Sequence, residues 1–194
     1  MSTATMISST RYTPLAKETM MDTPELVIAA QDVLRQGLRL LSTLSDAKYS
    51  RVVAAPFNAS IGQHYRHVLE HFQCLINGLP VGEVNYDARQ RNPRIENEAA
   101  FATTATGDVL NTLQTWTDAT LGHYCASVSS VAYSSAAPSR IDSNIARELA
   151  YCIGHAIHHY AIIRLVCNEV GVSVPAEFGY APSTIKYQST MAAD

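Results

Sequence analysis

SIGQHYRHVLEHF, residues 60–72, carries three of the seven histidines of this chain, and GHAIHHYAII, residues 154–163, carries three more. On an α-helix each residue advances by about 100°, so residues three, four and seven apart share a face. Each stretch can therefore present at least two imidazoles on one side. If two such helices pack side by side, the imidazoles converge, and converging neutral imidazoles are typical of a transition-metal site.

Helical periodicity favours one histidine pair in the second stretch. Apolar residues between Ile145 and Cys167 form a core-facing stripe, and His155 and His159 lie on its border. His158 lies much further round and is expected to face solvent. A single HxxxH pair is common in helices and usually forms hydrogen bonds, so the second cluster is what strengthens the metal interpretation.

The first stretch is less decisive. His64 and His71 lie closest to its apolar stripe, whereas His67 lies about 40° further round. Periodicity alone ranks His64 and His71 above His67 as inward-facing residues, and that choice stays open. His123, far from both stretches, is expected to be a surface or capping histidine.

Composition predicts an ordinary globular chain. Its 194 residues are 47% hydrophobic and 16% charged, which suits one domain over residues 23–194. A net charge of −3 and a pI near 6.1 give no reason to expect a nucleic-acid or membrane partner. Residues 1–22 lack an apolar signal segment and are expected to form a flexible arm, so a cytoplasmic location is the default.

The cysteines occur singly, without CxxC spacing, and are expected to be buried free thiols. Cys74 and Cys152 are the two expected to lie near a histidine face; the others are Cys125 and Cys167.

Apolar spacing predicts four helices, joined by irregular segments, in an all-α four-helix bundle. The second is capped by Asn58 or Ser60. The expected ranges are 24–45, 60–79, 106–127 and 144–170. Residues 80–105 are expected to be irregular, 128–140 to form a ribbon or loop, and the tail from 172 to be non-helical.

At this point the sequence resembles a known family. SIGQHYRHVLEH and GHAIHHY, in this order and in the second and fourth helices, are similar to the motifs of the DinB superfamily of metal-binding four-helix bundles. The resemblance spans about residues 24–172. It implies that Ser60 is the serine with which the second helix of this family begins. It also implies that the metal ligands are His67, His155 and His159, with His64 as the runner-up.

The resemblance also implies a chemistry. Three imidazoles leave at least one coordination position open, which is the geometry of a catalytic site. Zinc and nickel suit imidazole best, with iron and manganese as further candidates. The family includes thiol-dependent S-transferases, so the expected substrates are a small electrophile and a low-molecular-weight thiol. A metal-dependent hydrolase is a further candidate.

Other side chains near the histidines are weaker candidates. Glu148 or Glu70 could orient a ligand histidine, and Glu148 and Tyr160 are the only catalytic candidates. Packing is the favoured role for Tyr160 and for Tyr151. The arginines at 89, 91 and 94 could recognise an anion, although a solvated ionic loop is the favoured interpretation.

Two other classes of protein remain compatible with the sequence. One is a non-catalytic stress protein that binds a metal or a small ligand through the same histidines. The other is a helical bundle whose histidines have only structural roles. A homodimer is compatible with each of the candidate functions, but no residue identifies an interface.

Overall fold

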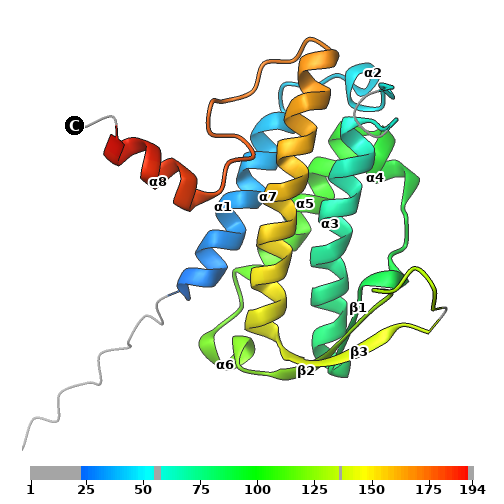
Figure 1. Ribbon diagram of the computed structural model, residues 1–194, viewed down its shortest axis with the longest axis vertical. Helices are drawn as coiled ribbons and strands as arrows, with labels where there is room; N and C mark the ends of the chain where they lie inside the picture. The colour runs from blue at the N-terminus through cyan, green and yellow to red at the C-terminus, as the bar shows by residue number, and fades with distance from the viewer. Residues whose placement is uncertain (1–22, 55–57, 136, 192–194) are drawn as a thin grey trace, which may run out of the picture.

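Four long helices lie side by side in the computed structural model, which describes residues 23–54, 58–135 and 137–191 (Figure 1). They are α1 (Glu25–Leu41), α3 (Ile61–Gly78), α5 (Ala99–Leu113) and α7 (Ile145–Glu169). Helix α7 packs against α3 and α1, and α5 packs against the same two helices. The expected arm at residues 1–22 lies outside the described residues.

One hydrophobic cluster joins these helices. Side chains that are fully buried include Leu34 of α1, Phe72 of α3, Leu113 of α5 and Ile163 of α7. Apolar residues at helical spacing put one stripe of each helix into this cluster, as the periodicity predicts. The core therefore fixes which faces of α3 and α7 turn toward each other.

Local sequence explains where α3 and α7 begin. The Ser60 side chain accepts from the Gln63 backbone N–H, and the Gln63 side chain accepts from the Ser60 N–H. This capping box satisfies two backbone donors that the first turn leaves unpaired. At α7 the Asn144 side chain accepts from the Arg147 N–H.

The protein is mostly helical, as the expectation of an all-α fold has it, but it also contains a small sheet that was not expected. The strands are β1 (Glu83–Asn85), β2 (Tyr124–Ser129) and β3 (Ser139–Asn144). Strand β2 lies in the middle, parallel to β1 and antiparallel to β3. The range 128–140, expected to form a ribbon or a loop, contains the end of β2, the start of β3 and the connection between them. The sheet covers one end of α3 and α7 (Figure 1).

The expected third helix at 106–127 was misplaced. Helix α5 ends at Leu113, and the segment beyond it forms α6 and β2. Thr106, where the third helix was expected to begin, is fully buried inside α5, and its hydroxyl donates to the Ala102 carbonyl.

Short helical elements occupy the connections, including the 80–105 segment expected to be irregular. They are α2 (Asp46–Tyr49), α4 (Pro93–Asn97), α6 (Asp118–Leu121) and the 3₁₀ turns Leu79–Val81 and Tyr86–Ala88.

The expectation of a non-helical tail was also wrong, because α8 (Pro182–Met191) begins at the second of the two tail prolines. Proline at the first helical position loses no hydrogen bond, so Pro182 starts this helix rather than excluding it. None of its residues is buried, and Figure 1 shows it projecting away from the other helices. No helix among the described ranges is long and apolar enough to cross a membrane.

Candidate metal centre

Three histidines from two helices converge between α3 and α7. His67 of α3 and His155 and His159 of α7 each place a ring nitrogen within 4.8 Å of the other two. Their ring centroids lie 4.9 Å apart for His67 and His155, 4.6 Å for His67 and His159, and 4.5 Å for His155 and His159. All three side chains are half-buried. We call these three residues the histidine triad.

The triad has the protonation state that metal binding requires. Burial, assisted by neighbouring imidazoles, lowers the pKa of His67 to about 2, that of His159 to about 3 and that of His155 to about 4. All three rings are therefore neutral near pH 7, and a neutral imidazole has a lone pair for a metal ion.

One nitrogen of the triad has no partner. His155 Nε2 is buried and makes no hydrogen bond within the described part of the chain. A buried polar atom without a partner is costly, and a metal ion would supply the missing interaction. The donor set and this unpaired atom both fit a transition-metal ion.

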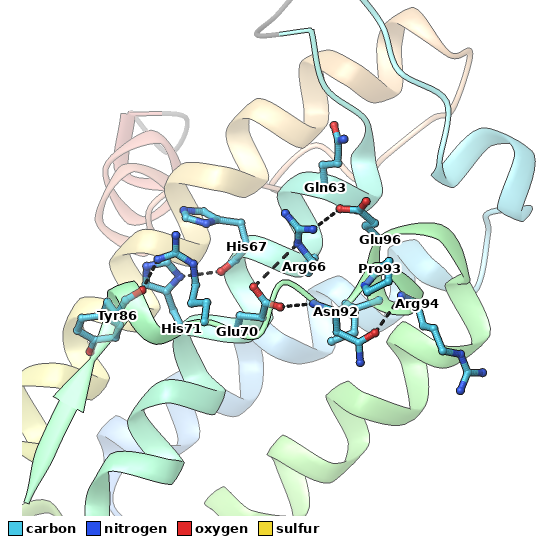
Figure 2. Close-up of polar contacts among 12 residues, drawn as sticks. Gln63, Arg66, His67, Glu70, His71, Tyr86, Asn92, Pro93, Arg94 and Glu96 are labelled. Atoms are coloured by element: carbon cyan, nitrogen blue, oxygen red, sulfur yellow. Dashed lines mark hydrogen bonds and ion pairs between the residues drawn. The ribbon is translucent and has the colours of Figure 1, made fainter. Parts of the chain in front are cut away.

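His64 and His71, which periodicity ranked above His67, lie beside the triad rather than in it. His64 Nδ1 lies 3.1 Å from His159 Nδ1, a hydrogen-bonding distance. His71 is buried, and its Nδ1 donates to the His67 carbonyl oxygen over 2.7 Å (Figure 2). Both histidines contact a triad residue and can hold it in position.

The remaining histidines lie outside the cluster, as expected. His158 is exposed on α7. His123 is also exposed, and its Nδ1 donates to the Thr120 carbonyl oxygen.

The two carboxylates expected to orient a ligand histidine have other partners. Glu148 accepts hydrogen bonds from the hydroxyls of Tyr86, Ser127 and Ser143, at 2.8, 3.1 and 2.6 Å. Glu70 accepts from the Asn92 backbone N–H. Within the described residues neither carboxylate is bonded to an imidazole, so the orienting role expected of them is not seen.

The candidate catalytic tyrosine lies in the core. Tyr160 is fully buried, and its ring stacks between Tyr65 and Phe178. Its hydroxyl points toward α1, where it lies 2.4 Å from the position that a Cβ would take at Gly37. This placement agrees with the packing role favoured from sequence. Tyr151, in contrast, is partly exposed and stacks on His155 with centroids 5.5 Å apart.

Tyr86 is a residue that sequence reasoning missed. Its ring stacks on His71 at 5.2 Å and packs against Tyr151 at 5.1 Å, while its hydroxyl donates to Glu148. It lies in a 3₁₀ turn between β1 and α4, and no local pattern marks such a turn as adjoining α3 and α7. Beside it is a cavity of about 320 Å³ that Glu148 and Tyr151 also line.

The arginines of the 86–94 segment separate into different environments. Arg94 pairs with Glu98 and lies over the Phe101 ring, which is the ionic surface role favoured from sequence. Arg91 is exposed. Arg89 is half-buried, and it donates to the carbonyl oxygen of Tyr86, whose ring stacks on His71.

The cysteines are free thiols, as expected. Cys152 is buried with its sulfur 3.7 Å from the Tyr86 hydroxyl, and burial raises the pKa of this thiol to about 12. Cys152 therefore stays protonated near neutral pH.

Together these features define a class, a mostly helical protein with a histidine triad between two of its long helices. The DinB superfamily model matches residues 29–163, and the chain belongs to that superfamily.

Two solved structures share the fold. A DinB-like protein from Bacillus subtilis superposes with a TM-score of 0.60 at 17% identity, over 80% of this chain and 99% of that one. A DinB-like protein from Bacillus cereus gives a TM-score of 0.50, also at 17% identity, over 78% of this chain and 94% of that one.

One curated relative is more similar in sequence. FK506-binding protein 5 of Rhizopus delemar is 36% identical over 104 residues. The match covers 54% of this chain but 27% of that protein. The chain therefore spans about a quarter of that relative's length.

Proposed function

We propose that this protein binds one divalent transition-metal ion through His67, His155 and His159. The observation that carries the proposal is the convergence of three neutral imidazoles from two helices, with His155 Nε2 buried and unpartnered. Zinc or nickel fits this donor set best, and iron or manganese is the next choice. The α1, α3, α5 and α7 helices would act as the four-helix bundle that holds the ligands.

We further propose that the protein is a metal-dependent enzyme, most simply an S-transferase acting on a low-molecular-weight thiol and an electrophile. A divalent ion with three protein ligands acts as a Lewis acid and lowers the pKa of a thiol or water that it binds. His64 and His71 would keep two of the ligand rings in place, and Tyr151 would form one side of the substrate entrance. Membership of the DinB superfamily supports this choice over a purely structural role for the histidines.

Elemental analysis of the purified protein tests metal binding directly. We expect about one equivalent of a transition metal in the wild type, because one triad offers one site. The His155→Ala variant should lose that metal, since it removes one of three ligands. His123→Ala is the matched control and should retain it, because His123 is exposed and its side chain donates to the Thr120 carbonyl oxygen rather than to a triad residue.

The outcomes separate the candidate functions. If wild type and His155→Ala contain equally little metal after incubation with zinc or nickel, the proposal fails and the histidines are structural. If metal is bound but no thiol reacts with a generic electrophile, the non-catalytic binding protein becomes the better description. Thiol conjugation that His155→Ala abolishes would support the transferase.

A further inference from the structure

Arg89 lies in a part of the chain that is fixed beside the histidine triad. It directly follows the 3₁₀ turn Tyr86–Ala88, and one of its Nη1 hydrogens is donated to the Tyr86 carbonyl oxygen. The Tyr86 ring stacks on His71, which in turn bonds to the backbone of His67 (Figure 2). A short series of contacts therefore connects Arg89 to the triad.

The segment that carries Arg89 is anchored on both sides. Before it, the Asn85 side chain accepts from the N–H groups of Asp87 and Ala88, and the Tyr86 hydroxyl donates to the buried Glu148. After it, the Asn92 N–H donates to Glu70 over 2.8 Å. These bonds restrict where the guanidinium can go, so its place beside the histidines is built into the fold.

The charge of Arg89 is not neutralised by the protein. No carboxylate in the described ranges lies within 4.0 Å of it, whereas Arg66, Arg94 and Arg140 each have an acidic partner. Glu70 lines the same 230 Å³ cavity as Arg89, but it accepts from Asn92 and lies 3.9 Å from Arg66. A half-buried guanidinium without a counter-ion favours an anion from outside the chain.

A metal ion at the triad would add positive charge of its own. Neutral imidazoles leave the charge of a divalent ion uncompensated, so a bound ion and Arg89 would together attract an anion.

We infer that Arg89 binds a carboxylate group of the small molecule that the metal centre takes as its ligand. With one Nη1 hydrogen given to Tyr86, the Nη2 and Nε hydrogens remain as a planar fork that matches the two oxygens of a carboxylate. The substrate class is then an anionic small molecule, such as a carboxylate-bearing thiol or electrophile. This inference rests on the proposed metal centre.

Cobalt-substituted protein tests the inference without any assay of activity. The visible absorption bands of cobalt(II) change when a ligand enters its coordination sphere, so they can follow titration with two thiols. Mercaptoacetate is the anionic probe, because its sulfur can bind the cobalt while its carboxylate binds Arg89, and 2-mercaptoethanol is the neutral probe. Arg89→Gln should weaken mercaptoacetate binding on the order of 10- to 100-fold, the usual effect of losing a charge-assisted, bidentate contact. Binding of 2-mercaptoethanol should stay within about twofold.

Arg91→Gln is the matched control, because it removes the same charge from an exposed position two residues away. It should leave mercaptoacetate binding within about twofold of wild type. Arg89→Lys keeps the charge but not the fork, and should give an intermediate loss. If circular dichroism shows that Arg89→Gln does not fold, Arg89→Lys takes its place as the test variant.

The results distinguish the two proposals. Equal mercaptoacetate affinity in wild type, Arg89→Gln and Arg89→Lys would overturn the role of Arg89 and leave the metal centre intact. Equal weakening by Arg89→Gln and Arg91→Gln would also overturn it, because the effect would then be general charge. If the wild-type protein shows no cobalt bands, or if His155→Ala shows the same bands, the proposed metal centre is wrong. The inference about Arg89 then fails with it.

Discussion

Replacing His64 by alanine should weaken metal binding without abolishing it. His64 Nδ1 lies 3.1 Å from His159 Nδ1, so His159 would bind the ion through Nε2 while its Nδ1–H donates to His64. A hydrogen bond of this kind fixes both the tautomer and the orientation of a metal-binding ring. His64 is therefore expected to position a ligand rather than to act as one.

The size of the effect follows from what the substitution removes. A neutral hydrogen bond contributes about 1 kcal/mol net, and an imidazole ring that becomes free to rotate loses about 1 kcal/mol more on binding. The total of about 2 kcal/mol corresponds to about a 30-fold loss of affinity. That value lies inside the range of about 10- to 100-fold usual for such outer partners.

Competition with a chromophoric zinc chelator measures this affinity. His64→Gln should recover much of the loss, because a side-chain carbonyl can accept from His159. His158→Ala serves as the control, since His158 is an exposed neighbour of His159 on the same helix. If His64→Ala loses metal affinity as completely as His155→Ala does, His64 is itself a ligand. If His64→Ala keeps the wild-type affinity, the positioning role is refuted.

Two further predictions concern the stability of the metal-free protein. The triad pKa values lie below the value of about 6.5 for an unfolded imidazole, so unfolding takes up protons as the pH falls below about 6.5. The free energy of unfolding in chelator should therefore be lower at about pH 5 than at about pH 7.5, and urea denaturation giving equal values would contradict this. Separately, Gly37→Ala should cost about 1–3 kcal/mol, because its Cβ would lie 2.4 Å from the buried Tyr160 hydroxyl. Gly107→Ala should instead stabilise α5 by about 0.5–1 kcal/mol, because nothing lies within 4 Å of its Cβ. Equal denaturation midpoints for Gly37→Ala and Gly107→Ala would count against the packing argument.

Three of the four long helices could be predicted from local sequence. The expected range 60–79 differs by a single residue at each end from α3, and 144–170 likewise from α7. Their apolar stripes face one core, so periodicity alone reveals them. The expected first helix, 24–45, started correctly within one residue and ran a few residues past Leu41.

The errors lie where long-range contacts decide the structure. Residues 124–129 form β2 because β1 and β3 pair with them, and such pairing leaves little trace in local periodicity. The chain between Leu113 and Tyr124 therefore seemed to continue a helix that had already ended. In the tail, the prolines suggested irregular structure although one of them starts α8.

The candidate site, like the fold, could be predicted only in part from local sequence. The HxxxH pair on α7 was favoured by both periodicity and resemblance, and the structure places both residues in the triad. On α3, a helical wheel gives the direction of each side chain but not where α7 lies, so it could not separate His67 from His64 and His71. Tyr86 and Arg89 come from a turn whose position depends on contacts with Glu148 and Glu70, and no spacing rule links them to the histidines.

The division of the triad between α3 and α7 has a consequence for folding. His67 and His155 lie far apart in the sequence, with α5 and the whole sheet between them. An ion bound to both would act as a reversible cross-link that closes this long loop, and closing a long loop removes much of the freedom of the unfolded chain. Metal supply would then govern how often the two helices separate, and so how long each molecule survives proteolysis.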